Sequence, residues 1–264
     1  MDLKLADKTA LVSGSTGGIG FAIAQSLAQE GATVIVNGRS QERVNQAIDK
    51  IKATTPNAKV SGAALDLSTR EAADQLFQQV STIDILVNNL GIYEPKAFGD
   101  IADEDWLNIF EANVLSGIRL SRQYLPTMLE RNWGRIIFIS SESAVQIPVE
   151  MIHYGMTKTA QLAIARGLAE MTVGTGVTVN SVLPGPTRSE GVEDFVEKMA
   201  ADRGVDTAQV EKEFFESVRP SSLIKRFATS EEVAALVTYV SSPLSSATNG
   251  AALRVDGGVV RSIL

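Results

Sequence analysis

The chain has 264 residues, of which 44% are hydrophobic and 21% charged, a composition typical of a soluble globular protein with a substantial core. Its formal net charge is −7, and acidic chains have little affinity for nucleic acid or anionic membranes, so neither is expected as a partner. The chain has no cysteine and one histidine, which excludes disulfides, a thiol nucleophile and a Cys/His zinc site, and we expect no metal.

The first residues, MDLKLADKTALVSG, lack a cationic segment followed by a long apolar stretch, so we expect no secretory signal. No apolar run approaches the roughly 20 residues that a membrane-spanning helix needs. These features predict a cytoplasmic protein.

Short apolar runs alternate along the chain with longer stretches of helical periodicity. The predicted strands are TALVSG (9–14), TVIVNG (33–38), KVSGAAL (59–65), IDILVNN (83–89), GRIIFIS (134–140), GVTVNSVLP (176–184) and GAALRVDGG (250–258). The predicted helices cover 18–30, 41–53, 69–80, 104–131, 153–172 and 229–242. Apolar strands that alternate with helices predict a doubly wound α/β fold, a parallel sheet of about seven strands with helices on both faces.

The longest interruption of this alternation is the polar and charged segment 187–228. We expect a single nucleotide-binding domain over 1–264, with this segment inserted as a helical lid. In doubly wound sheets ligands bind at the carboxyl ends of the strands, and the lid is expected to cover that edge.

The first predicted strand runs into the glycine-rich stretch VSGSTGGIG, with glycines at 14, 17, 18 and 20, and then into a helix. Glycine lets the backbone approach a phosphate, and the helix N-terminus supplies free N–H groups and a partial positive charge. The alternative is a glycine-rich turn without a ligand. The spacing G-x-x-x-G-x-G also differs from the G-x-G-x-x-G fingerprint.

Tyr154 and Lys158 lie four positions apart in the predicted helix 153–172, and such a pair shares one helix face. An ammonium beside a phenol favours the phenolate, so the pair can make the tyrosine an acid. The alternative is a partly solvated surface pair, which is common at this spacing.

Further motifs occur in a fixed order along the chain: NNLG at 88–91, Asn113, ISS at 139–141, the Tyr154/Lys158 pair and PGP at 184–186. In this order, and with the glycine-rich turn, the chain resembles the short-chain dehydrogenase/reductase family over nearly its whole length, in particular members like 3-oxoacyl-[acyl-carrier-protein] reductase. The resemblance implies a Rossmann-type fold, a nicotinamide cofactor and interconversion of a ketone and a secondary alcohol. It also implies a homotetramer, with a homodimer as the alternative.

Carried over by the resemblance, the cofactor-binding residues are Gly14, Ser15, Thr16, Gly18, Ile19, Gly20, Arg39, Asp66, Leu67, Asn88, Gly91, Tyr154, Lys158, Pro184, Gly185, Thr187 and Ser189. Leu90 stands where the family has alanine, which puts the local shape in doubt, and Ser13 keeps the hydroxyl of the usual threonine.

Arg39 follows Gly38, where family members that use NAD often carry an acidic residue. A guanidinium matches a phosphate with forked, charge-assisted hydrogen bonds, so we expect NADP(H) to be favoured over NAD(H). A solvated arginine at a helix start is the alternative.

The resemblance assigns the catalytic roles. Tyr154 is the general acid/base, Lys158 lowers its pKa and holds the nicotinamide ribose, Ser141 orients the substrate oxygen, and Asn113 holds a water in the proton path. Ser140 and Ser143 are weaker candidates than Ser141. The single histidine, His153, points about 100° away from Tyr154 around the helix and is expected to be structural or adjacent to the substrate.

We therefore expect an NADP(H)-dependent oxidoreductase acting on a small carbonyl or alcohol, with a ketone or 3-oxoacyl compound as the leading substrate. An NAD-dependent hydroxy-acid or sugar dehydrogenase of the same family is one alternative. A dinucleotide-binding sensor without turnover and a Rossmann-like methyltransferase are others, but the chain retains every catalytic residue of the reductase pattern.

Overall fold

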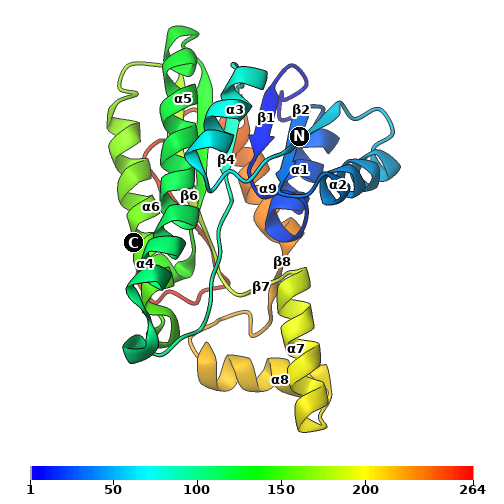
Figure 1. Cartoon of the computed structure of the whole chain (residues 1–264), viewed down its shortest axis with the longest axis vertical. Coiled ribbons are helices and arrows are strands. Elements are labelled where there is room, and N and C mark those ends of the chain that lie inside the picture. Colours follow the sequence, from blue (N-terminus) through cyan, green and yellow to red (C-terminus); the bar gives the residue numbers. More distant parts are fainter. Residues whose placement is uncertain (1, 264) are drawn as a thin grey trace.

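Strands and helices alternate through most of the computed structural model, which describes residues 2–263 apart from the side chains of residues 190, 194 and 195 (Figure 1). The strands of the main sheet are β1 (Thr9–Val12), β2 (Thr33–Gly38), β3 (Val60–Ala64), β4 (Ile85–Asn88), β5 (Gly134–Ile139), β6 (Val177–Pro184) and β9 (Ala252–Val255). They pair in parallel in the order β3-β2-β1-β4-β5-β6-β9.

The helices that flank this sheet are α1 (Gly18–Gln29), α2 (Gln41–Thr54), α3 (Arg70–Gln79), α4 (Asp103–Phe110), α5 (Ser116–Glu130), α6 (Ile152–Glu170) and α9 (Ser230–Ser241). Side chains from α1, α2 and α9 form one apolar cluster on the sheet, and side chains from α3, α5 and α6 form another. Successive residues of β1 divide between them, since Val12 lies in the first cluster and Leu11 in the second. The predicted doubly wound fold is confirmed.

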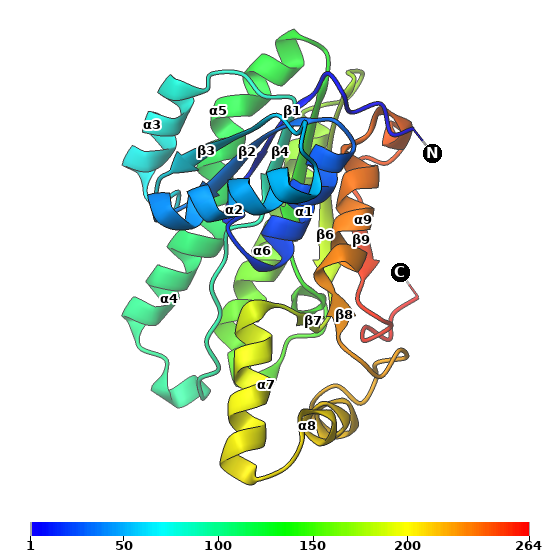
Figure 2. The ribbon, with the colours of Figure 1, turned by 90° about the vertical axis from the view of Figure 1, so that its right-hand side faces the viewer.

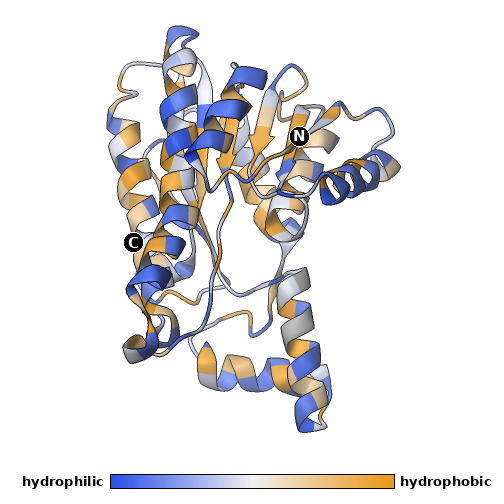
Figure 3. Ribbon diagram, in the orientation of Figure 1, coloured by the Kyte–Doolittle hydropathy of each residue, from blue (hydrophilic) through white to orange (hydrophobic). Residues whose placement is uncertain are grey.

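The hydropathy of each element follows from this layering. The buried strands are hydrophobic along their length, whereas α2, which lies at the rim, is mostly hydrophilic (Figure 3). Three flanking helices begin at a polar cap: Ser40 accepts from Arg43 N before α2, Thr69 from Ala72 N before α3, and Thr229 from Glu232 N before α9. At α1 the N-cap is Gly17, which has no side chain to offer.

The loops after β1 and β4 lead away from the centre of the sheet in opposite directions, because the chain passes from β1 outward to β2 and β3 before it returns to β4. In doubly wound sheets this switch point leaves a crevice at the carboxyl ends of the strands.

Residues 187–228, called the lid segment from here on, lie beyond that edge of the sheet (Figure 2). Two short strands, β7 (Thr187–Arg188) and β8 (Ala228–Thr229), pair in parallel and join the two ends of the segment. Between them lie α7 (Glu190–Arg203), α8 (Thr207–Glu213) and a π-helical turn, η5 (Phe214–Val218). The segment has an apolar cluster of its own, built on Val196, Ala200, Val210, Phe215 and Phe227.

The predicted helix over 104–131 is divided in the structure. A π-helical turn, η2 (Glu111–Leu115), separates α4 from α5. Such turns shift the backbone hydrogen bonds by one residue and frequently occur at functional sites. Within residues 2–263, none of the helices combines the length and the apolar character needed to cross a membrane.

Candidate active site

A cavity of about 700 Å³ lies at the switch point of the sheet. We call it the glycine-loop cavity, because Gly14, Thr16 and Gly18 from the loop after β1 line it, opposite Asn89 and Gly91 after β4.

The turn from β1 to α1 is shaped by its glycines. Gly14 and Gly18 have φ angles of +60° and +54°, which favour glycine. A Cβ on Gly20 would lie 2.4 Å from both Asn89 Nδ2 and Gly14 O, so the helix approaches the loop closely. Since the N-cap Gly17 offers no side chain, the first N–H groups of α1 receive no side-chain cap. An uncapped helix N-terminus at a cavity suits a phosphate group.

Asn37 holds this turn from within β2. Its side chain is buried, and Oδ1 accepts from Gly14 N at 3.0 Å while Nδ2 donates to Ala63 O and Leu65 O, each at 3.0 Å. Its backbone N donates to Ser15 Oγ at 2.9 Å. One amide side chain therefore fixes the glycine loop to the ends of β2 and β3.

The far end of the glycine-loop cavity carries charged residues. Arg39, Ser40 and Arg43 line it from the start of α2, and Asp66 lines it from the loop after β3. Arg39 is exposed to solvent, and Asp66 Oδ1 accepts from Ser68 Oγ at 2.7 Å. Guanidinium groups and a carboxylate thus share one end of the cavity.

Several predicted cofactor residues turn their side chains away from this cavity. Leu67 is fully buried in the core, Ile19 packs against the core, and Asn88 Nδ2 donates to Ser121 Oγ at 3.1 Å. The Ser15 hydroxyl donates to the backbone at 2.7 Å inside its own turn. Pro184 is buried at the end of β6.

A second cavity, of about 510 Å³, lies between α6, the end of β6 and the lid segment. We call it the tyrosine cavity, because Ser141 and Tyr154 line it together with Gly185 and Thr187. Tyr93 lines both cavities, and its ring lies edge-on to that of Tyr154 with centroids 6.1 Å apart. Tyr93 therefore borders both cavities and stands next to Tyr154.

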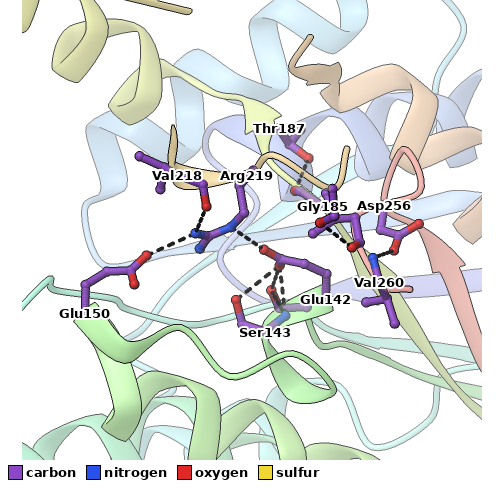
Figure 4. Close-up of polar contacts among 12 residues, drawn as sticks. Glu142, Ser143, Glu150, Gly185, Thr187, Val218, Arg219, Asp256 and Val260 are labelled. Carbon is purple, nitrogen blue, oxygen red and sulfur yellow. Dashed lines mark hydrogen bonds and ion pairs between the residues drawn. The ribbon is translucent and has the colours of Figure 1, made fainter. Parts of the chain in front are cut away.

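The start of the lid segment lies close to the glycine loop. Thr187 Oγ1 donates to Gly185 O at 2.9 Å (Figure 4). Ser189 lines the glycine-loop cavity, and its Cβ would lie 3.5 Å from a Cβ added to Gly18.

Burial dominates the electrostatics of the Tyr154/Lys158 pair. Burial, and then the Glu142 carboxylate, raise the pKa of Tyr154 above its ordinary value, while a hydrogen bond with Ser141 and the charge of Arg219 lower it. Burial lowers the pKa of Lys158 to about 8. The Lys158 ammonium lies 5.6 Å from the centroid of the Tyr154 ring.

Lys158 is connected to Asn113 through Gln161. Lys158 Nζ donates to Ile139 O at 2.9 Å and to Gln161 Oε1 at 3.4 Å, and Gln161 Nε2 donates to the backbone oxygen of Asn113 at 2.6 Å. The side chain of Asn113 is held separately, since its Nδ2 donates to Thr157 Oγ1 at 3.0 Å. Asn113 lies in the π turn at 111–115, and its backbone oxygen accepts a hydrogen bond from the side chain of Gln161 on α6.

Glu142 is a buried carboxylate beside Ser141. Its Oε2 accepts from Ser141 Oγ at 2.5 Å and from Ser143 N at 2.9 Å, and its Oε1 accepts from Arg219 Nε at 3.2 Å. Arg219 Nη1 also donates to Glu150 at 3.1 Å, so the guanidinium stands between two carboxylates (Figure 4).

The weaker candidates have structural contacts. Ser140 Oγ donates to the backbone oxygen of Lys158 at 2.8 Å, and Ser143 Oγ donates to Glu142. His153 is buried, with its ring edge-on to that of Trp106 at 5.8 Å.

Sequence reasoning missed Asn37, Gln161 and Arg219. An amide in the otherwise apolar strand TVIVNG was a signal for Asn37. Gln161 occupies a position on α6 that no motif marks, and Arg219 reaches the tyrosine cavity only through the fold of the lid segment.

Comparisons with known proteins identify the family and the relatives that this chain resembles. Residues 8–200 match the family model described as short chain dehydrogenase. The chain is 53% identical over 263 residues to the uncharacterised oxidoreductase YvaG of Bacillus subtilis (strain 168), with full coverage of both chains. It is 33% identical to the 3-oxoacyl-[acyl-carrier-protein] reductase FabG of Aquifex aeolicus, covering 98% of this chain and 100% of FabG. The structure of L-sorbose reductase from Gluconobacter frateurii, complexed with NADPH and L-sorbose, superposes with a TM-score of 0.93 at 30% identity over both whole chains.

Proposed function

The chain belongs to the short-chain dehydrogenase/reductase family and is an NAD(P)-dependent oxidoreductase acting on CH–OH and C=O groups, and on that premise we propose that it reduces ketones with NADPH through Tyr154. The observation that carries this proposal is that Tyr93 borders both cavities and lies edge-on to Tyr154, so each cavity comes within one side chain of the phenol. A dinucleotide along the glycine-loop cavity and a ketone in the tyrosine cavity would meet at the phenol.

The residues present fit a nicotinamide dinucleotide. The uncapped N-terminus of α1 suits the diphosphate, and the glycine loop that leads to it needs the positive φ angles of Gly14 and Gly18 and the close approach at Gly20. Arg39 stands at the opposite end, where it can pair with a 2′-phosphate. L-sorbose reductase was solved with NADPH, which supports the same choice here.

When bound, the nicotinamide supplies a hydride to the carbonyl carbon. Ser141 donates a hydrogen bond to the carbonyl oxygen and fixes its direction, and Tyr154 gives that oxygen its proton, leaving an alcohol and a phenolate. Lys158 is held by Ile139 O and Gln161 and stabilises the phenolate that forms. In the reverse direction the phenolate removes the alcohol proton.

An uncharged ketone is the substrate class that the tyrosine cavity favours. The two arginines that line it are already paired, Arg219 with Glu142 and Glu150, and Arg203 with Glu213. A carboxylate on the substrate would have to displace one of these partners, which argues against the hydroxy-acid alternative. Apolar walls from Val192, Met199 and Phe214 suit the body of a ketone.

Cofactor use can be tested by following nicotinamide absorbance with a ketone panel that includes a ketose and a 3-oxo acid. We expect turnover of neutral ketones, and a ten- to hundredfold preference for NADPH over NADH, because a charge-assisted bond to phosphate contributes about 1.5–3 kcal/mol. Arg39→Leu should remove the preference, while Arg70→Leu, which removes an exposed arginine paired with Asp74, should keep it.

Equal kcat/KM with both cofactors in the parent protein would refute the NADP(H) assignment, and absence of turnover would refute the reductase. Exchanging Gly38 for aspartate is a less clean test, because a Cβ there would lie 2.4 Å from Thr16 Cγ2 and would displace a residue of the same cavity.

A further inference from the structure

Ser141 has one hydroxyl proton and more than one acceptor for it. In the structure that proton goes to Glu142 Oε2 at 2.5 Å, although Tyr154 also lies within hydrogen-bonding reach of Ser141. In the proposed reduction the same proton must reach the substrate oxygen. An unneutralised carboxylate is the strongest of these acceptors, because charge-assisted hydrogen bonds are about twice as strong as neutral ones.

Arg219 neutralises this carboxylate from the lid segment. Its Nε donates to Glu142 at 3.2 Å and its Nη1 donates to Glu150 at 3.1 Å and to Val218 O at 3.0 Å. The side chains of Arg219 and Glu142 are 12% and 6% exposed, so solvent screens their interaction weakly. Arg219 follows directly after η5, and its position depends on the fold of the lid segment.

We propose that Glu142 and Arg219 are positioning residues that couple the lid segment to the proton donor. Arg219 neutralises the carboxylate that competes for the Ser141 proton, so the proton-transfer site is complete only while the lid segment holds Arg219 between Glu142 and Glu150. The inference rests on the proposed function, since it takes Tyr154 as the acid.

The charges around Tyr154 make the sign of the effect definite. Glu142 and Tyr93 raise its pKa, and Ser141 and Arg219 lower it. Lys158 lies on the same helix, and Glu150 enters through its pair with Arg219. Removing Arg219 leaves Glu142 uncompensated and strengthens its hold on the Ser141 proton, and both changes disfavour the phenolate.

The test is the pH dependence of kcat/KM for alcohol oxidation with NADP⁺, whose rising limb reports the loss of the Tyr154 proton. Arg219→Gln should move the midpoint of this limb upward by about one pH unit, and Glu142→Gln should move it downward. The midpoint of the double variant should return close to that of the parent, because both charges are then absent. The midpoint of Arg219→Lys should stay near that of the parent.

A second readout needs no turnover. The tyrosinate absorbance of the NADP⁺ complex can be titrated with pH, and the same titration of Tyr154→Phe is subtracted. The midpoint of this titration should move upward in Arg219→Gln and downward in Glu142→Gln, as in the kinetic test. Arg226→Gln is the matched control, since it removes another arginine of the lid segment, paired with Glu232 at 2.7 Å outside the tyrosine cavity. It loosens the segment without changing the charge beside Tyr154, so its midpoint should stay in place.

Midpoints that do not move, or that move in the same direction in Arg219→Gln and Glu142→Gln, would overturn the coupling. If Arg219→Gln fails to fold, the nearly isosteric Glu142→Gln decides alone, and an unchanged or raised midpoint overturns the proposal. Absence of turnover across the ketone and alcohol panel refutes the proposed function instead, and is distinguishable because the tyrosinate titration does not require turnover.

Discussion

Gln161 joins two residues that the proposed chemistry uses. It is buried, accepts from Lys158 and donates to the backbone oxygen of Asn113. Gln161→Leu leaves two buried polar groups without this partner, so the free energy of unfolding should fall by about 1–3 kcal/mol, and kcat should fall with it. Urea unfolding measures the first effect. Gln46→Leu on the exposed face of α2 is the control, and an equal loss in both variants would contradict the assignment.

Lys158 gives stability a pH dependence of known sign. Burial lowers its pKa from 10.5 to about 8, so between these values the unfolded chain binds a proton that the folded protein does not. Stability from this group therefore rises with pH across that window. The free energy of unfolding of the parent, relative to Lys158→Met, should rise by up to about 3 kcal/mol from pH 8 to pH 10. A difference in the free energy of unfolding that does not change with pH would contradict this prediction. Lys50→Met, at an exposed position, is the control, and its difference from the parent should not change with pH.

At the scale of single residues, the sequence could predict those whose chemistry is tied to local spacing. The glycines at 14, 18 and 20, and Tyr154 with Lys158, depend on a turn and a helix face; Gly14 and Gly18 line the glycine-loop cavity, and Tyr154 lines the tyrosine cavity. Arg219 and Gln161 could not be predicted, because Glu142 lies 77 positions from Arg219, and the Asn113 oxygen that Gln161 joins to Lys158 lies 48 positions from Gln161. Ser15 and Leu67 belong to the motifs, but their side chains serve the turn and the core.

At the scale of elements, every predicted strand of the sheet and every predicted flanking helix is present. The division of 104–131 by a π turn was not predicted, because a one-residue shift of backbone hydrogen bonds leaves no periodic signal in the sequence. The helices within 187–228 were expected only as a group. Their cluster of apolar side chains supports the proposal that the segment is a lid inserted in one domain.

Phe215 is the centre of the lid segment's core. It is buried, and its ring lies 5.0 Å from that of Phe214 and 5.1 Å from that of Phe227. Truncation of a buried phenylalanine costs about 3–5 kcal/mol, and here the loss falls on the segment rather than on the sheet. Phe215→Ala should raise KM and expose 187–228 to limited proteolysis. Phe98→Ala, at a position 64% exposed, is the control and should be cleaved no faster than the parent. Equal cleavage rates of Phe215→Ala and Phe98→Ala would contradict the prediction.

At the scale of the whole molecule, the order of the strands puts the ends of β1, β4, β5 and β6 along one edge, where both cavities open. Alternation of strands and helices was enough to predict this edge, since right-handed crossovers leave few other arrangements. The cytoplasmic location stays a prediction.

Assembly is a further proposal at this scale. Large apolar side chains remain exposed on α4 and just beyond the end of α6, with Leu107 at 70% and Met171 at 63%. Exposed apolar surface of this kind favours burial against another copy of the chain, and we propose the homotetramer that the family resemblance implies, with a homodimer as the alternative. Light scattering at micromolar concentration should give a multiple of the chain mass. A mass near 28.2 kDa, that of one chain, would refute the proposed assembly.

The central claim is that Tyr154 delivers the proton in an NADPH-dependent ketone reduction. It is tested most directly by kcat/KM for ketone reduction in the parent and in Tyr154→Phe, with the Kd for NADPH measured on the same two proteins. The account predicts a loss of about a hundred- to ten-thousandfold in kcat/KM, because general acid catalysis contributes about that much, with a Kd that changes little. A variant that keeps kcat/KM within a few fold of the parent would contradict it.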